Sequence, residues 1–310
     1  METTVVTTVR PLPPYDFELT AGQPNYSREQ PFKTEEYVDG CYIRLLDLGD
    51  KVALANVRSV GTVDEPELSV ELTGNDLTNT DTDRAAKQIT WLLGCDQDLR
   101  PFYDAVVRDP VLADVIHDFY GYHNTCTASV YEALVQAVLG QQIATNVSRI
   151  IRSLLVENYG VRATIMDREW YAFPRAESLA IAEVDDLRQL KLSFRKAEYI
   201  QGIARTALDS GDNLDGMHDL KDDEVVKRMV AMRGVGQWTA QWVLVRALAR
   251  PDGFPVGDLA LRKTVSSLYF DGAEIDDSQL LTFSERWSPW RSYATSYLFA
   301  ALRSGRVAGS

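Results

Sequence analysis

The chain has 310 residues, 45% hydrophobic and 25% charged, a composition typical of a globular protein with room for two or three domains. No apolar run approaches the roughly 20 residues that span a bilayer, and the N-terminus METTVVTTVRPLPPYD lacks the apolar core of a signal peptide. We therefore expect a cytoplasmic protein. Three scattered cysteines, Cys41, Cys95 and Cys126, exclude a disulfide framework and a zinc site.

The net charge of −13 argues against a nucleic-acid-binding protein, because such domains are usually basic. The charge is unevenly distributed, however. Residues 1–110 contain 10 Lys and Arg against 20 Asp and Glu, whereas residues 111–310 contain 22 against 25. A local basic face therefore remains possible in the last two thirds of the chain.

The N-terminal region has the pattern of a small antiparallel sheet. We expect residues 1–14 to form a frayed arm. The segments Tyr37–Leu48 and Lys51–Val57 are rich in Val, Tyr, Ile and Leu, and Gly49-Asp50 separates them as a hairpin turn would. Apolar and polar residues alternate over Pro66–Leu72, which indicates a half-buried strand.

From Arg84 onward the apolar residues recur at helical spacing. Pro110 can begin a helix that continues to Phe119, and Thr127 or Ser129 can cap a long helix to about Tyr159. Further helices are predicted over Ser178–Leu190 and Phe194–Leu208, and after the break at Ser288-Pro289. We expect the tail beyond Gly305 to be disordered.

Gly140, Gln141 and Gln142 interrupt the apolar stripe of the long helix. A buried amide pair usually satisfies its polar neighbours. On a helix surface that faces DNA, the same amides could enter the base stack.

The segment Val225–Lys263 contains a glycine-pivoted helical hairpin. Gly234 and Gly236 allow a tight turn and leave backbone N–H groups unshielded at a helix start, which suits an anion such as phosphate. Thr239 could add a hydroxyl and Arg233 a cation. Any tight turn between helices can also use glycine, so this motif alone is a weak signal.

Asp258 falls at the start of the next helical segment, where the helix dipole favours an ionised carboxylate. It can be a plain N-cap, or an acid that stabilises positive charge on a sugar or orients a water. Trp238 and Trp242 lie four residues apart on one helix face. Such a pair usually packs in a core, but beside an acid its aromatic faces suit an extruded cationic base.

Taken together, these residues resemble the helix-hairpin-helix glycosylase superfamily, and more closely the bacterial 3-methyladenine DNA glycosylase II (AlkA-type) family. Four segments carry the resemblance: PPYDFEL at Pro13–Leu19, YEALVQAVLGQQI at Tyr131–Ile143, RGVGQWTA with FPVGDLALRK, and ERWSPWRSYA at Glu285–Ala294. They span nearly the whole chain in the order that the family shows. The W-x-P-W-R-S-Y run is especially specific.

The resemblance implies an α+β fold, with a small N-terminal antiparallel β domain before a mostly α-helical two-domain core. We expect domains at 1–110, 111–235 and 236–310, with the last helices packing back on the first domains. It also implies that the protein flips and excises alkylated bases, such as 3-methyladenine and 7-methylguanine, by hydrolysing the N-glycosidic bond. Asp258 would be the essential acid.

The resemblance also assigns the remaining site residues. Gly234, Gly236 and Thr239 would hold phosphate, and the carbonyls of Val230, Met232 and Val235 would bind a structural Na⁺ or K⁺. Phe299 would add an aromatic wall to the base pocket. Gln142 stands where the family's best-known member inserts a leucine wedge into the DNA stack.

Two departures from relatives refine the expected activity. Lyase-competent relatives have a lysine where Trp238 stands, so we expect a monofunctional enzyme. Relatives with an iron–sulfur cluster have four closely spaced cysteines after the catalytic region, and this sequence has none there. We expect no other cofactor, a monomer, no membrane partner, and double-stranded DNA with damaged bases as the partner, which would bring the protein to the nucleoid.

Other functions are compatible with the same residues. A glycosylase of this fold could act on 8-oxoguanine, uracil or hypoxanthine. A non-catalytic DNA-binding protein could use the hairpin only as a clamp, and a helical protein could use it as a structural turn. Asp258 and the tryptophan pair favour an enzyme.

Overall fold

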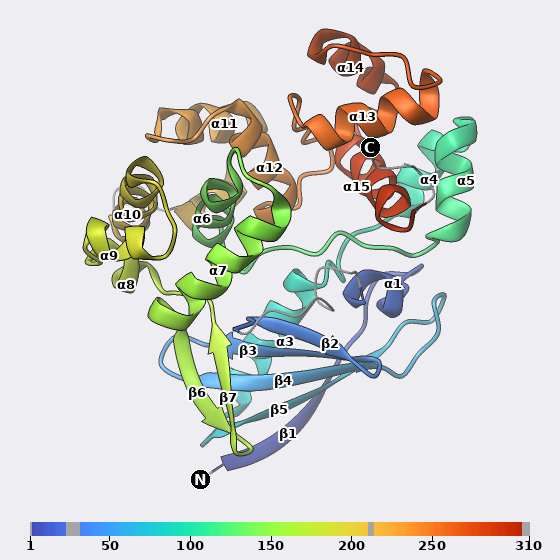
Figure 1. The fold of residues 1–310 in the computed structure, drawn as a ribbon. Helices are drawn as coiled ribbons and strands as arrows, with labels where there is room; N and C mark the ends of the chain where they lie inside the picture. The colour runs from blue at the N-terminus through green and yellow to red at the C-terminus, as the bar shows by residue number, and fades with distance from the viewer. Residues whose placement is uncertain (1, 23–31, 210–213, 306–310) are drawn as a thin grey trace.

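The N-terminal part of the protein is a five-stranded antiparallel sheet that lies below two groups of helices (Figure 1). The computed structural model describes residues 2–22, 32–209 and 214–305. The strand order is β1-β5-β4-β3-β2. The strands are β1 (Glu2–Val9), β2 (Glu35–Val38), β3 (Cys41–Asp47), β4 (Val52–Ser59) and β5 (Leu68–Asn75). The predicted hairpin and the strand that follows it are confirmed as β3, β4 and β5.

The prediction of a frayed arm over residues 1–14 was wrong. Strand β1 pairs with β5 along its whole length, from Glu2 opposite Asn75 to Val9 opposite Leu68. Its β-branched residues suit an extended backbone, but the partner strand lies about 60 residues away in the sequence. No local turn signal marks such a long-range pairing.

The two faces of the sheet pack against different elements, because successive side chains of a strand point to opposite faces. Leu46 packs on helix α3 (Asn79–Leu92) in one hydrophobic cluster. Its neighbour Leu45 packs in another cluster, against the hairpin β6 (Val161–Ile165) and β7 (Arg168–Ala172). The sequence reading did not foresee this second hairpin.

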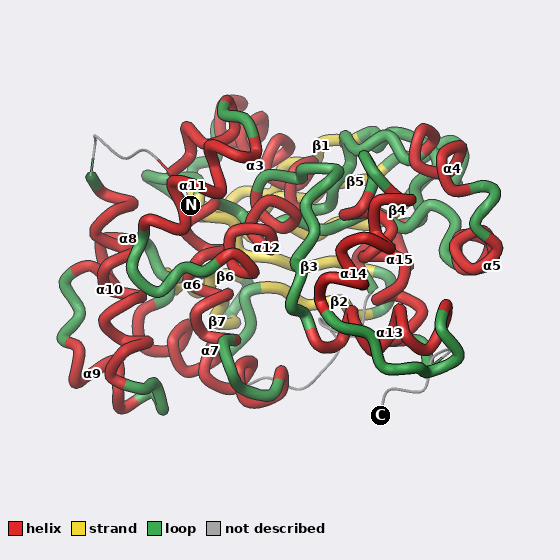
Figure 2. Tube along the Cα trace, turned by 90° about the horizontal axis from the view of Figure 1, so that it is seen from above, coloured by secondary structure: helices red, strands yellow, loops and turns green. Residues whose placement is uncertain are grey.

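Most helices belong to two lobes, each around its own hydrophobic cluster, and Figure 2 shows them side by side from above. The first lobe contains α6 (Val130–Gly140), α7 (Thr145–Tyr159), α8 (Ala176–Ala180), α9 (Val184–Gln189), α10 (Phe194–Leu208), α11 (Asp222–Ala231) and α12 (Gln237–Ala247). The second lobe contains α4 (Arg100–Val106), α5 (Pro110–Asp118), α13 (Leu259–Tyr269), α14 (Asp277–Ser284) and α15 (Arg291–Arg303). The short elements are α1 (Phe17–Ala21) and the 3-10 turns η1 (Leu214–Asp219) and η2 (Glu285–Trp287).

Several helix predictions are confirmed and two need correction. The helix Phe194–Leu208 is observed as predicted, and Ser129 caps α6 through the backbone N–H of Glu132 at 3.0 Å. The single helix to Tyr159 was wrong, because α6 ends at Gly140 and α7 begins only at Thr145. The predicted helix Ser178–Leu190 is also two short helices, α8 and α9.

The α+β fold class is confirmed, while the domain boundaries at residues 110 and 235 stay a prediction. The hydrophobic clusters group α12 with α6 in the first lobe, and α4 and α5 with α13–α15 in the second. Among the described residues, no helix is long and apolar enough to cross a membrane. The tail beyond Gly305 lies outside the described residues.

Candidate active site

The hairpin turn joins α11 to α12 through two glycines with different environments. Gly234 has φ +91°, and a Cβ there would lie 2.3 Å from the ring of Tyr199, so only glycine fits. Gly236 is the N-cap of α12 with φ −102°, and a Cβ there would have no neighbour within 4 Å. Gly234 therefore shapes the turn, whereas Gly236 leaves the start of α12 open to a ligand.

Gln141 holds the turn from the end of α6, a role that the sequence reading missed. Its Nε2 donates to the carbonyl of Gly234 at 2.9 Å and lies 3.4 Å from Thr239 Oγ1. Thr239 itself is only 2% exposed, so its hydroxyl faces Gln141 inside the lobe. The signal was present in the sequence as an amide at the end of an apolar stripe.

Arg233 and Gln142 lie on the exposed side of this region. Arg233 forms an ion pair with Glu198 at 3.2 Å, and its guanidinium lies 5.6 Å from the ring centre of Tyr199. Gln142 is exposed at φ +56° in the α6–α7 connection, directly after the residue that contacts the hairpin. Both side chains are therefore accessible at the surface, and their contact with DNA stays a prediction.

The three residues whose carbonyls are expected to bind a cation lie at the end of α11 and in the hairpin turn that follows it. Val230 lies in the last turn of α11, and the carbonyl of Met232 accepts from the N–H of Val235 at 3.1 Å. A carbonyl oxygen has a second lone pair, so Met232 can still accept another partner. In the described part of the chain, no group of three or more His, Cys, Asp or Glu side chains is arranged to hold a metal ion.

Asp258 is the N-cap of α13, and two N–H groups hold its carboxylate. Oδ1 accepts from the backbone N–H of Leu261 at 3.0 Å. Oδ2 accepts from the indole Nε1–H of Trp238 at 3.2 Å. The side chain is partly exposed, and the positive end of the α13 dipole favours its negative charge. The acid is thus an N-cap, as its position predicted, and is also oriented by an aromatic residue from the hairpin helix.

The predicted aromatic residues come from both lobes. Trp238 and Trp242 stack with ring centres 6.4 Å apart and an angle of 22° between their planes. Trp242 packs at the edge of the first lobe, and Phe299 on α15 packs at the edge of the second. The structure therefore joins the tryptophan pair to Asp258, whereas the pocket role of Phe299 stays a prediction.

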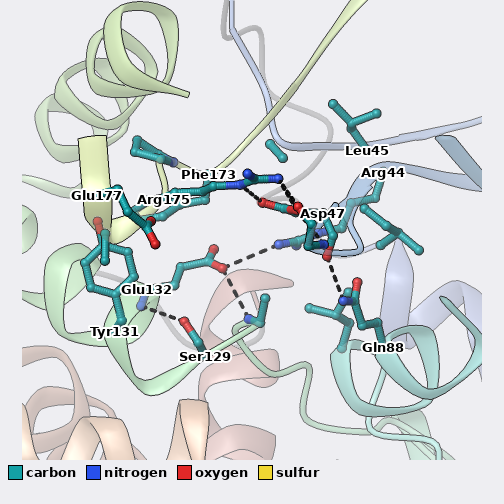
Figure 3. Close-up of a pocket in the computed structure, with 17 residues that line it drawn as sticks. Arg44, Leu45, Asp47, Gln88, Ser129, Tyr131, Glu132, Phe173, Arg175 and Glu177 are labelled. Atoms are coloured by element: carbon teal, nitrogen blue, oxygen red, sulfur yellow. Dashed lines mark hydrogen bonds and ion pairs between the residues drawn. The ribbon is translucent and has the colours of Figure 1, made fainter. Parts of the chain in front are cut away.

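A cavity of about 460 Å³ lies elsewhere, between β3, the start of α6 and the segment after β7 (Figure 3). Its charged side chains are largely paired with one another. Arg175 points toward Asp47 and contacts it at 2.6 Å, and Glu132 lies 3.5 Å from Arg44. None of its lining residues belongs to the hairpin or to the second lobe, so this cavity is separate from the site at Asp258.

The fold and the site define a helix-hairpin-helix protein with a carboxylate at the entry of the following helix. Residues 135–291 match the family model of the HhH-GPD superfamily base excision DNA repair proteins. This match runs from the middle of α6 to the first residue of α15, and so includes the hairpin, Trp238 and Asp258. The chain therefore belongs to the HhH-GPD superfamily of base excision DNA repair proteins.

Individual relatives agree with this family. A DNA-3-methyladenine glycosylase of Bacillus subtilis is 32% identical over 207 residues, which are 67% of this chain and 68% of that protein. The fold is similar to that of a 3-methyladenine DNA glycosylase from Archaeoglobus fulgidus, with a TM-score of 0.83, 24% identity, and coverage of 96% and 98% of the two chains. An 8-oxoguanine glycosylase/lyase from Clostridium acetobutylicum has a TM-score of 0.72 at 18% identity, with 97% of each chain covered.

Proposed function

We propose that this protein is a monofunctional DNA glycosylase that excises alkylated bases, such as 3-methyladenine and 7-methylguanine, and acts as a monomer in the cytoplasm. The family supports an enzyme that repairs DNA bases, and the Bacillus subtilis relative carries the name of an alkyl-base glycosylase. The observation that carries the proposal is the Asp258 carboxylate, held by Leu261 and Trp238 beside a stacked tryptophan pair.

The reaction breaks the bond between the base nitrogen and C1′ of the sugar. The bonding electrons leave with the base, so a cationic methylated purine departs as a neutral molecule without needing a proton. Positive charge develops on the sugar, where the Asp258 carboxylate stabilises it. The oxygen of a water molecule then bonds to C1′ and loses a proton to solvent. One ionised acid is therefore sufficient for an alkylated base, without a second catalytic residue.

The indole of Trp238 supports the absence of lyase activity. Strand cleavage by a Schiff base needs an amine that can attack C1′. At the position where lyase-competent relatives have that amine, this chain has an indole whose N–H points to Asp258. The Trp238–Trp242 stack offers aromatic faces for a cationic base.

The hairpin supplies the proposed DNA backbone contact. The N–H groups of the first turn of α12 have no partner within their helix, and Gly236 leaves them accessible. We infer that this turn binds a phosphate without reading the sequence. The carbonyls of Val230, Met232 and Val235 would hold a Na⁺ or K⁺, which would offset the negative charge of the DNA backbone. We propose no other cofactor and no iron–sulfur cluster.

The test is base release from methylated duplex DNA by the wild type and by Asp258→Asn. Asparagine caps a helix about as well as aspartate, so the variant should keep its fold. We expect free 3-methyladenine from the wild type, and a rate at least about 10³-fold lower from the variant, because the stabilising charge is lost.

Asp276→Asn is the matched control, because Asp276 caps α14 in the same way, by accepting from the N–H of Gln279 at 2.8 Å. This variant should retain wild-type activity. If Asp258→Asn released bases as fast as Asp276→Asn, Asp258 would not be the catalytic acid. Release of 8-oxoguanine or uracil in place of alkylated bases would contradict the proposed substrate.

A further inference from the structure

The W-x-P-W-R-S-Y run, Trp287–Tyr293, has no role in the mechanism above. In the structure it leads into α15 and contacts residues 248–257, which connect α12 to Asp258. We call residues 248–257 the crossover segment, because Leu248 is buried in the first lobe and Phe254 in the second. The motif thus lies where the chain passes from one lobe to the other.

An ion pair fixes the middle of the crossover segment to α15. Arg291 donates to both carboxylate oxygens of Asp252, from Nε to Oδ1 at 2.8 Å and from Nη2 to Oδ2 at 2.7 Å. Ser288 Oγ donates to the same carboxylate at 3.2 Å. A bidentate arginine pair restricts orientation as well as distance, which a single contact does not.

Ser292 holds the backbone on both sides of that ion pair. Its N–H donates to the carbonyl of Pro251 at 2.9 Å, and its buried Oγ lies 2.6 Å from the carbonyl of Arg250 and 2.9 Å from that of Gly253. Serine at this position therefore contacts three carbonyls of the crossover segment. These contacts give the motif's Arg-Ser pair a structural explanation that composition alone did not provide.

Helix α12 holds the same segment from the other lobe. Gln241 Oε1 accepts from the N–H of Phe254 at 2.9 Å, and the N–H of Arg250 donates to the carbonyl of Leu244 at 2.9 Å. At Gly253 the packing is so close that a Cβ would lie 3.0 Å from the side chain of Val245. Both lobes therefore fix the crossover segment within a few residues of Asp258.

We propose that Arg291 and Ser292 are positioning residues. They act through the crossover segment to keep the Asp258 carboxylate within hydrogen-bond distance of the Trp238 indole. This inference rests on the proposed catalytic role of Asp258. Trp238 belongs to α12 in the first lobe, whereas Asp258 begins α13 in the second lobe. The hydrogen bond between them depends on the relative placement of the two lobes. The contacts of Arg291 and Ser292 with the crossover segment, which we call the α15 clamp, fix that placement.

The experiment compares Arg291→Met with the wild type in three measurements: the single-turnover rate of base release, the affinity for abasic-site duplex, and the NMR signal of the Trp238 indole N–H. Assignment of that signal among the six tryptophans uses Trp238→Phe. We expect the rate to fall about 100-fold, as for a displacement of about 1 Å, with the abasic-site affinity within about twofold of wild type. The Trp238 signal should shift or broaden.

The matched control is Arg175→Met. Arg175, at the start of α8, also forms a bidentate ion pair, with Asp47 at the end of β3 at 2.6 and 2.7 Å, and neither residue contacts the crossover segment through this pair. It should leave the rate and the Trp238 signal unchanged. The double variant Asp252→Arg/Arg291→Asp exchanges the two charges. It should release the base faster than either single variant, Asp252→Arg or Arg291→Asp.

A wild-type rate and an unshifted Trp238 signal in Arg291→Met would overturn the proposal. The NMR signal separates this outcome from a failure of the proposed function. If the wild type released no alkylated base, the catalytic proposal would fail, while a shift of the Trp238 signal in Arg291→Met alone would still support the clamp.

Discussion

The indole N–H of Trp238 donates to Asp258 Oδ2 at 3.2 Å, so one hydrogen bond joins the hairpin helix to the start of α13. The other oxygen of the carboxylate is held by the N–H of Leu261 at 3.0 Å. Two donors from different lobes therefore define the orientation of the acid. Trp238 therefore helps to place the carboxylate that we propose as the catalytic acid.

Trp238→Phe should lower the rate of base release about 10-fold, because a hydrogen bond to a charged group contributes about 1.5 kcal/mol and phenylalanine keeps only the aromatic face. Single-turnover measurements on methylated duplex give this rate. Trp242→Phe is the control, since Trp242 shares the stack, whereas the hydrogen bond to Asp258 comes from Trp238. Equal losses in the two variants would assign the effect to the stack and not to the hydrogen bond.

Wild-type protein should release the base and leave the abasic strand intact. Residue 238 is a tryptophan, which has no side-chain amine, so it should form no Schiff base with C1′. Borohydride reduction during the reaction would trap such an adduct as a covalent protein–DNA complex, visible on a denaturing gel. Trapped complex that disappears in Asp258→Asn would show that the enzyme has lyase chemistry after all.

The two hairpin glycines should respond differently to substitution. Gly234→Ala should destabilise the fold by about 3 kcal/mol, because alanine disfavours φ +91° and its Cβ would overlap the Tyr199 ring. Gly236→Val should cost at most about 1 kcal/mol, since its backbone is extended and its surroundings are open. Thermal and urea unfolding measure both effects.

The same pair of variants tests the phosphate contact. Gly236→Val should weaken binding to abasic-site duplex about 10-fold, as for one lost hydrogen bond to a charged group, and equally on all sequences. Fluorescence anisotropy with duplexes of different sequence measures this. Unchanged affinity in a folded Gly236→Val protein would show that the hairpin is a structural turn only.

Much of the site could be predicted because it depends on local chemistry. The structural role of each of three features depends only on residues within one or two helical turns. These features are the glycines of the turn, the aspartate at a helix start, and the two tryptophans four residues apart. The contact between Trp238 and Asp258 spans 20 residues and two lobes, so no periodicity indicates it. The role of Gln141 is equally distant, because its partner Gly234 lies 93 residues later.

The missed elements of the fold have similar causes. The β6–β7 hairpin turns at Met166 and Asp167, both with positive φ, where the usual sequence signal is Asn-Gly or Asp-Gly. The break between α6 and α7 places Gln142 at φ +56°. Glutamine rarely adopts this conformation, so its presence in the sequence does not predict a break there. In both places the tertiary structure overrides local preference.

A buried ionic cluster between the sheet and the first lobe should make stability depend on pH. Glu35 in β2 lies 3.0 Å from Arg44 in β3 and 3.2 Å from Arg152 in α7. Burial raises the pKa of Glu35, but Arg152, Arg44 and the Thr34 hydroxyl outweigh it and lower the pKa from 4.5 to about 2. A carboxylate with a lowered folded-state pKa stabilises the fold above its unfolded pKa, and that contribution is lost as pH falls from about 4.5 toward 2.

Glu35→Gln should therefore lower the free energy of unfolding by about 3 kcal/mol at pH 7, because Arg152 loses its carboxylate partner and Arg44 is left with Glu132. The difference from wild type should shrink as pH falls through that window, since the wild-type carboxyl becomes neutral as well. Glu36→Gln is the control on the same strand, because its partner Arg168 is 55% exposed and an exposed pair contributes less than about 1 kcal/mol. Urea unfolding from about pH 7 down to about pH 3 measures all three proteins, and the lower part of this range covers the upper part of the window from 4.5 to about 2 in which the difference should shrink. A Glu35→Gln difference that stayed constant over this range would mean that packing, and not the charge of Glu35, stabilises the contact between the sheet and α7.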